Sequence, residues 1–250
     1  METRQIKELI ISTYNNSVVN NTVIINQIQK KDLSVPKGTV NWILYDMVKR
    51  GEANRIGKGV YSFSEKKDWV PKLSQRAEGL RRILIDNFPY LKVTIIDTSQ
   101  LQEFMIQQPF QYPLILEVAR DLVESVVTKL QQLDVNAYAK KDYRLADIFR
   151  KNDYPVYVTK AIQTTASFSL QKNIKAAKLE KILVDALCEP KLYSQFQGWE
   201  LENIYVNALE KYIINFSQLL KYATSRGRKA EVLKLLEGNI SFNKYREAEK

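Results

Sequence analysis

The segment from Pro36 to Phe63 reads PKGTVNWILYDMVKRGEANRIGKGVYSF, and its periodicity changes halfway along. Between Pro36 and Gly51, apolar residues recur at intervals of three and four, which predicts a helix over about 36–50. Proline is tolerated in a first helical turn, and glycine commonly follows a last one. The residues expected on the buried face of this helix are Val40, Ile43, Leu44, Met47 and Val48.

After Gly51 the period shortens to two, as in a β-strand. Residues 53–56 and 60–63 are short strand candidates, and Gly57-Lys58-Gly59 joins them. A glycine-containing connection between two such runs predicts a β-hairpin, here with a lysine at its tip.

Two more helices are expected before Pro36. The spacing of apolar residues predicts one helix over about 2–14, and a second, short helix that Asn21 or Thr22 caps. Three short helices followed by a hairpin form the pattern of a winged helix-turn-helix. We therefore predict such a DNA-binding domain in residues 1–70.

Burying the aliphatic stripe of the 36–50 helix turns its other face outward. A recognition helix meets the major groove with such a face: polar groups bond to base edges, rings pack on thymine methyls or on the sugar-phosphate chain, and cations neutralise phosphates. The alternative is that the two rings on this face pack against the second domain, as in helix-turn-helix units that contact protein. The candidate DNA-binding residues are Thr39, Asn41, Trp42, Tyr45, Lys49, Arg55 and Lys58.

Composition limits the chemistry. The 250 residues carry a formal net charge of +10, which favours polyanionic partners such as nucleic acid. Histidine is absent, so histidine-based catalytic triads and histidine-ligated metals are excluded. The single cysteine, Cys188, cannot form an intrachain disulfide and is interpreted as a small core residue. We expect no catalysis, no cofactor and no bound metal.

The sequence predicts a cytoplasmic protein. The longest uncharged stretch, from Leu9 to Gln29, holds eleven Ser, Thr, Asn or Gln residues in twenty-one and cannot cross a bilayer. The first residues lack the basic-then-apolar grading of a signal peptide, and a lone cysteine fits a reducing compartment.

A polar stretch near residue 70 separates two compositions, and we predict a second domain over 73–250. Strand and helix signals alternate there as far as about residue 177, and the pattern from 178 to 236 is nearly all helical. The expected fold is therefore α+β: an N-terminal winged helix-turn-helix, then a mixed α/β domain with a helical C-terminal tail. The expected strands are 92–96, 114–118, 135–139 and 156–158, and the expected helices before residue 177 are 74–87, 101–106 and 121–133.

Two features of the second domain leave alternatives open. Asp97 and Glu117 each end a predicted strand, and carboxylates at adjacent strand ends can hold Mg²⁺, so a metal-dependent nuclease is one alternative function. Strand ends are commonly acidic, however, and no lysine follows Glu117 by two residues. A basic stretch near the C-terminus is either a second DNA-binding surface, a surface for an acidic partner or a solvated helix end. It contains Lys221, Arg226, Arg228, Lys229 and Lys234.

Several segments resemble a known family. The runs LEKILVD (179–185), FQGWE (196–200) and KYIIN (211–215), with Tyr222-Ala223, are similar to the C-terminal domain of AbiE-type antitoxins. These are transcriptional regulators of bacterial abortive-infection systems. Residues 49–52 and 57–61 are similar to the winged-helix end and wing of the same family.

The resemblance implies a repressor that binds its own operon and acts as the antitoxin of a type IV toxin–antitoxin system in phage defence. It also implies a partner toxin of the nucleotidyltransferase class, with which the antitoxin need not form a stable complex. Glu180, Lys181 and Asp185 match positions of the family's C-terminal domain. They are either functional or pair within their own helix and cap the core. The residues themselves support only the DNA-binding half of this expectation, and a protein–protein adaptor is a further alternative.

Overall fold

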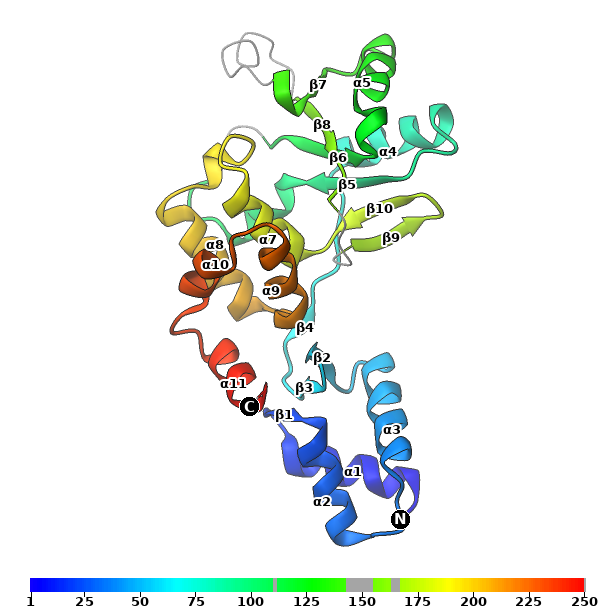
Figure 1. Ribbon diagram of the computed structural model, residues 1–250, viewed down its shortest axis with the longest axis vertical. Helices are drawn as coiled ribbons and strands as arrows, with labels where there is room; N and C mark the ends of the chain where they lie inside the picture. The colour runs from blue at the N-terminus through cyan, green and yellow to red at the C-terminus, as the bar shows by residue number, and fades with distance from the viewer. Residues whose placement is uncertain (110–111, 143–154, 163–166, 250) are drawn as a thin grey trace. The chain divides into compact units, whose positions relative to one another are not determined.

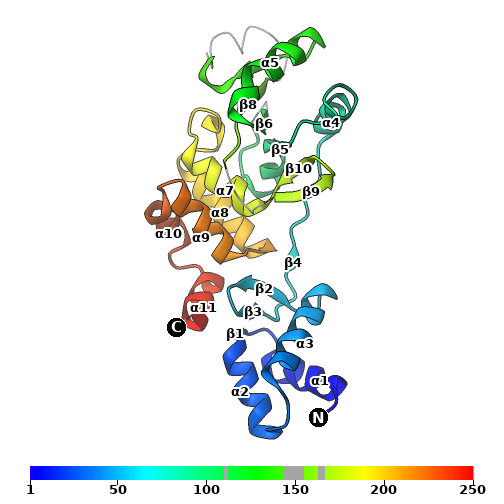
Figure 2. The same ribbon diagram turned by 45° about the vertical axis from the view of Figure 1, so that its right-hand side comes forward.

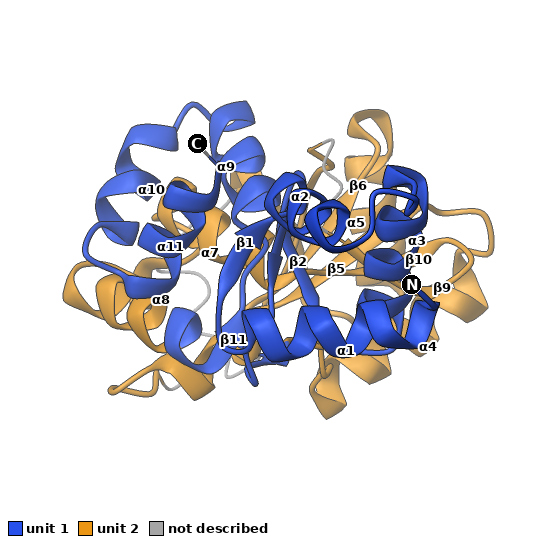
Figure 3. Ribbon diagram, turned by 90° about the horizontal axis from the view of Figure 1, so that it is seen from below, with its two compact units in different colours: residues 1–68, 208–250 blue, residues 69–207 orange. Residues whose placement is uncertain are grey.

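The computed structural model describes residues 1–109, 112–142, 155–162 and 167–249. It has an α+β fold (Figure 1). The chain forms two compact units (Figure 3): unit 1 comprises residues 1–68 and 208–250, and unit 2 comprises residues 69–207. In the described part of the chain, no helix is both long and apolar enough to span a membrane.

The N-terminal part of unit 1 has the element order of a winged helix-turn-helix. The strands pair antiparallel in the order β1-β3-β2, which places the strand between the first two helices at the edge of the sheet. The predicted helices and hairpin are thus present, and β1 is a strand that we did not predict. The elements are α1 (Thr3–Tyr14), β1 (Val18–Asn20), α2 (Asn21–Lys31), α3 (Lys37–Lys49), β2 (Asn54–Gly57) and β3 (Val60–Ser62).

The predicted core of this module is confirmed. The aliphatic stripe of α3 packs with residues of α1 and α2, and only its last member, Val48, is half-buried. Gly51 follows α3 with φ +74° and its N–H donates to the carbonyl of Val48, as expected of a glycine after a helix. The N-cap of α2 was predicted one or two residues too late: it is Asn20, whose Oδ1 accepts from the Thr22 N–H.

The C-terminal helices, in residues 208–250, belong to unit 1. We predicted that they belong to the same domain as residues 73–207. The short strands β4 (Lys67–Asp68) and β11 (Tyr212–Ile213) pair in parallel. Helix α9 (Phe216–Ser225) contacts β2, and α11 (Ile240–Glu249) contacts β1 and β3 (Figures 1 and 2). Helix α10 (Lys229–Leu236) packs on α9. The contacts that define unit 1 join residues far apart in the chain, so local periodicity carried no sign of them.

Unit 2 is built on a mixed sheet in the order β7-β8-β6-β5-β10-β9. Strands β5 and β6 are antiparallel, β6 and β8 are parallel, and β10 pairs in parallel with β5. The strands are β5 (Val93–Asp97), β6 (Leu114–Val118), β7 (Ala137–Ala139), β8 (Val156–Lys160), β9 (Ser167–Gln171) and β10 (Ile174–Ala177). The α-helices described in this part are α4 (Gln75–Asn87), α5 (Val123–Gln132), α7 (Leu179–Cys188) and α8 (Trp199–Lys211), of which α8 continues into unit 1 from residue 208. 3-10 helices cover Thr98–Phe104, Arg120–Leu122, Lys140–Asp142 and Ser194–Phe196.

Side-chain alternation gives the sheet two different faces. Leu114, Leu116 and Val118 of β6 join the core formed with α4 and α5. Glu117 lies on the opposite face, where it contacts Lys181 of α7. The sheet of unit 2 therefore lies between α4 and α5 on one side and α7 on the other. Cys188, expected in the core, is half-buried at the end of α7.

Candidate nucleic-acid interface

Helix α3 presents its two large rings to solvent. Trp42 is 57% exposed and Tyr45 is 65% exposed, and Asn41 and Lys49 are exposed beside them. Thr39 is half-buried at the flank of the same face. The outward face predicted from the apolar spacing is confirmed. Exposed large rings grouped on one helix face are typical of a surface that contacts another molecule.

Three of the candidate residues are cations. In the described part of the chain, no carboxylate forms an ion pair with Lys49 or Lys58, and both side chains are exposed. Arg55 is exposed too, and its Nε donates to the carbonyl of Gly57 at 3.3 Å, which lays the side chain along the wing. These three cations have the freedom to meet phosphates.

Sequence reasoning missed Lys37, the first residue of α3. It is exposed, and the first turn of α3 has no acidic residue. A positive charge at a helix N-terminus is disfavoured by the helix dipole, so Lys37 does not serve the stability of α3. Its position next to the polar end of the outward face suits the binding of an anion. The signal was present in the sequence as a lysine directly after the proline that starts the helix.

Asp46, the acidic residue on α3, is already neutralised. Its carboxylate accepts from Lys7 at 2.5 Å and lies 3.0 Å from Nε of Arg50. The hydrogen bond from Lys7, followed by that from Arg50, lowers the pKa of Asp46. The negative charge of this residue is therefore compensated within the module.

Asn21 connects the wing tip with α3, a role that sequence reasoning also missed. Its backbone N–H donates to the carbonyl of Gly59 at 2.7 Å, and its Nδ2 donates to Oδ1 of Asn41 at 3.2 Å. Gly59 has φ +72°, and a Cβ there would lie 2.9 Å from Oδ1 of Asn21. The tip therefore requires glycine, and Asn21 brings the lysine-bearing tip and the predicted base-reading asparagine onto one module.

Charge is concentrated in unit 1. Residues 1–68 and 208–250 contain twenty Lys and Arg against twelve Asp and Glu, a net charge of +8. Residues 69–207 contain eighteen against sixteen, a net charge of +2. The C-terminal helices supply half of the excess of unit 1, which makes the whole unit the basic part of the molecule.

The predicted second basic surface is not one continuous helix. Lys221 lies in the middle of α9, Arg226 and Arg228 flank the turn at Gly227, and Lys229 and Lys234 lie in α10. Arg226 is half-buried and donates to the Tyr222 hydroxyl at 3.0 Å, and Arg228 pairs with Glu231 at 2.7 Å. Lys221 and Lys229 are exposed. The arginines are thus engaged within their own helices, and the exposed charge of this surface is mainly that of its lysines.

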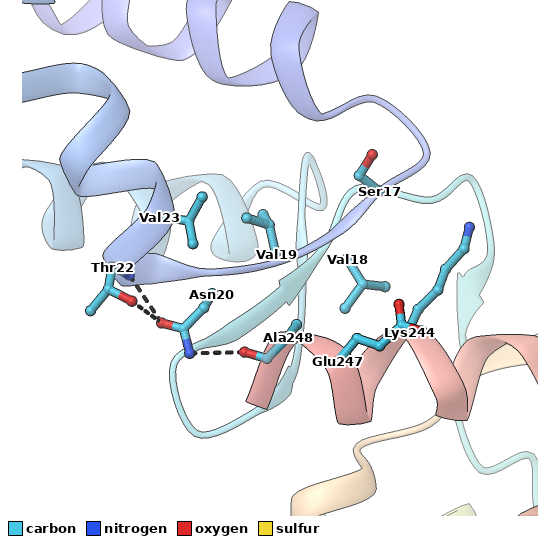
Figure 4. Close-up of a pocket in the computed structure, with 9 residues that line it drawn as sticks. All are labelled: Ser17, Val18, Val19, Asn20, Thr22, Val23, Lys244, Glu247 and Ala248. Atoms are coloured by element: carbon cyan, nitrogen blue, oxygen red, sulfur yellow. Dashed lines mark hydrogen bonds between the residues drawn. The ribbon is translucent and has the colours of Figure 1, made fainter. Parts of the chain in front are cut away.

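A groove of about 520 Å³ in unit 1 lies where α11 approaches β1 and the start of α2 (Figure 4). Asn20 lines it, and its Nδ2 donates to the carbonyl of Ala248 at 3.1 Å while its Oδ1 caps α2. Lys244 and Glu247 of α11 also line this groove. Asn20 therefore joins the helix-turn-helix to the C-terminal helix.

The two carboxylates of the nuclease alternative do not meet. In the antiparallel pair β5–β6, Asp97 is opposite Leu114 and Glu117 is opposite Thr94, and the two side chains lie on opposite faces of the sheet. Asp97 accepts from Ser74 N–H at 2.7 Å and from the Ser99 hydroxyl at 2.6 Å. Among the described residues, no group of three His, Cys, Asp or Glu residues has the geometry to hold a metal ion. The nuclease alternative required both carboxylates at one edge of the sheet, and they do not lie there because β5 and β6 are neighbours that run antiparallel.

Glu117 instead belongs to a buried ion cluster. Lys181 of α7 is 0% exposed, and its Nζ lies 2.7 Å from Oε1 of Glu117 and 2.6 Å from Oδ2 of Asp185. Glu180 is buried as well. Of the positions that the resemblance singled out, Lys181 and Asp185 thus pair within α7 and anchor that helix to β6.

One protein-family model matches residues 39–241, from the first turn of α3 to the start of α11. The chain belongs to the DUF6577 family. DUF6577 is described as a family of unknown function. No curated protein matches the chain. All seven candidate DNA-binding residues lie inside the DUF6577 match, whereas α1, α2 and Asn21 lie before it.

Proposed function

We propose that this chain is a sequence-specific DNA-binding repressor that acts as the antitoxin of an AbiE-like type IV toxin–antitoxin system in phage defence. The observation that carries the DNA-binding part is the outward face of α3, where Trp42 and Tyr45 stand exposed beside Asn41. This face belongs to a winged helix-turn-helix within a unit of net charge +8. Exposed rings of this kind on a recognition helix suit groove contact.

In the proposed complex, α3 enters the major groove. Asn41 and Thr39 offer amide and hydroxyl groups to base edges, while Trp42 and Tyr45 pack on methyl groups or sugars. Lys49, Arg55 and Lys58 contact phosphates, and Lys37 adds a cation at the start of α3. This binding requires no catalytic residue and no cofactor.

An electrophoretic shift assay with DNA from upstream of the chain's own gene tests the DNA-binding part. We expect the logarithm of the binding constant to fall linearly with the logarithm of salt concentration, and Lys58→Ala to reduce the slope by about 0.9 or less. Asn41→Ala is expected to reduce discrimination between operator and competitor DNA by about 1–3 kcal/mol at one base pair. Lys129→Ala, which removes an exposed lysine of α5 in unit 2, is the matched control and leaves both quantities unchanged.

If Asn41→Ala and Lys58→Ala together leave binding unchanged, α3 and the wing are not the DNA-binding surface. The exposed rings of α3 also favour a second candidate, a protein–protein adaptor. Capture of a protein partner that is insensitive to salt, lost in Trp42→Ala and accompanied by no DNA shift, would support that adaptor instead.

The antitoxin part rests on the resemblance of residues 178–236 and 36–63 to AbiE-type antitoxins. Co-expression with a nucleotidyltransferase-like toxin from the neighbouring gene tests it. We expect growth to be restored without a stable complex between the two proteins. Continued growth arrest would refute the antitoxin role and leave the DNA-binding part standing.

A further inference from the structure

The wing is covered by a side chain from the far end of the chain. A Cβ added to Gly57 would lie 2.5 Å from Cε2 of Tyr245 and 3.4 Å from its Cδ2 and Cζ. No side chain fits between the two, so the ring of Tyr245 in α11 rests directly on the backbone of β2. Gly57 is the residue immediately before Lys58 at the wing tip.

Tyr245 is itself firmly held. It is buried, and its ring centroid lies 5.2 Å from that of Phe216 and 6.2 Å from that of Phe242. Its hydroxyl donates to Glu249 at 2.8 Å. Burial is the main cause of its raised pKa, so the phenol stays neutral at physiological pH. These contacts fix the ring within the C-terminal helices.

The same helices hold the wing module at other points. Asn215, the N-cap of α9, donates from Nδ2 to the carbonyl of Arg55 at 3.0 Å. Lys66 donates to the Ser241 hydroxyl of α11 at 2.9 Å. With the bond from Asn20 to Ala248, α11 is attached to the winged helix near both of its ends.

We propose that Tyr245 is a positioning residue of the DNA-binding surface, because its ring on Gly57 sets where the wing presents Lys58 to a phosphate. This inference rests on the proposed DNA binding. The wing strands are only four and three residues long, and Lys58 stands between two glycines. β1 pairs with β3 and Asn21 holds the tip at Gly59, whereas β2 is the edge strand of this sheet. Glycine adds backbone freedom, so on the β2 side of the tip the contact of Tyr245 with Gly57 restricts where Lys58 lies.

The test measures the affinity of the full chain for a duplex of random sequence by fluorescence anisotropy over a range of salt concentrations. Lys58→Ala should lower the slope of log affinity against log salt by about 0.9 or less. Tyr245→Leu should lower it by the same amount, and the double variant should fall no further, because the lysine contact is already lost. Tyr245→Phe keeps the ring and should retain the wild-type slope.

Gly57→Ala tests the contact from the other side, since its Cβ forces the wing and the ring apart while Phe216 and Phe242 stay paired. We expect Gly57→Ala to lower the salt slope by the same amount as Tyr245→Leu. Gly57→Ala carries the test if Tyr245→Leu fails to fold, as judged by circular dichroism and by a stoichiometric titration that gives the fraction of chains able to bind DNA.

The two failures are distinguishable. If the wild-type chain does not bind duplex DNA, the proposed function has failed, and this inference fails with it. The other outcome is that Lys58→Ala lowers the salt slope, while Tyr245→Leu and Gly57→Ala keep the wild-type slope and adding Lys58→Ala to either of them lowers the slope as much as it does in the wild type. In that case DNA binding stands and the positioning role of Tyr245 is refuted.

Discussion

Nδ2 of Asn21 donates to Oδ1 of Asn41 across 3.2 Å, so the first residue of α2 holds the amide that α3 turns outward. The bond occupies one lone pair of Oδ1 and leaves Nδ2 of Asn41 facing solvent as a donor. The backbone N–H of Asn21 also binds the carbonyl of Gly59 at the wing tip, so one residue is hydrogen-bonded to both the Asn41 amide and the wing tip.

Asn21→Ala is therefore expected to affect specificity more than stability. Without its donor, the Asn41 amide rotates freely, and discrimination at the contacted base pair should fall about fivefold, the equivalent of one hydrogen bond of about 1 kcal/mol. Competition binding against single-base-pair variants of the operator measures this. Asn26→Ala, at an exposed position of the same helix, is the control and should leave discrimination unchanged. Equal discrimination by wild type and Asn21→Ala would contradict the role given to Asn21.

Gly59→Ala and Gly38→Ala should change stability in opposite directions. Gly59 has φ +72° and its Cβ would meet Asn21 at 2.9 Å, so alanine there should lower the free energy of unfolding by about 1–3 kcal/mol. Gly38 lies in α3 with no atom within 4 Å of its Cβ position, and alanine should raise the free energy of unfolding by up to about 1 kcal/mol. Urea denaturation measures both. If Gly59→Ala leaves the free energy of unfolding unchanged, the wing tip does not need this backbone conformation.

Lys181→Met should destabilise the chain severely. It leaves Glu117 and Asp185 buried without their cation, and breaking a buried ion pair in this way costs about 3–5 kcal/mol. The triple variant Lys181→Met/Glu117→Gln/Asp185→Asn also removes both negative charges and should recover a large part of the loss. Thermal unfolding followed by circular dichroism distinguishes the two. If Lys181→Met is as stable as the wild type, the cluster does not anchor α7.

Asp46 should make the stability of unit 1 depend on pH in the acid range. Its pKa is lowered in the folded state, first by Lys7 and then by Arg50. A lowered folded pKa means that the contribution of Asp46 is complete above the unfolded value of about 3.9 and is lost as the pH falls through the folded value. The difference in stability between wild type and Asp46→Asn should hold at neutral pH and start to shrink below about 3.9. A difference that stays constant through the acid range would contradict this assignment.

Local patterns in the sequence predicted α3 and the wing well. The stripe from Val40 to Met47, the glycine after α3 and the change to period two all act over a few residues, so they are visible without the fold. The exposed rings Trp42 and Tyr45 follow directly from that stripe. Most strands of unit 2 were visible for the same reason, as short apolar runs.

Features that depend on pairing over long distances were missed. Strand β1 is only three residues long, with polar residues on both sides, and it pairs with β3. The place of α11 beside the wing depends on Tyr245 meeting Gly57, which no spacing in either segment encodes. Asp97 and Glu117 lie on opposite faces of the sheet because of the register in which β5 and β6 pair. The sequence of either strand alone does not reveal that register.

Amide hydrogen exchange of the full chain, with and without duplex DNA from upstream of its gene, tests the central claim most directly. The account predicts that DNA slows exchange in Lys37–Lys49 and at the wing tip around Lys58, and leaves the helices of unit 2 unchanged. Unchanged exchange in α3 and the wing under conditions where DNA is bound would contradict it.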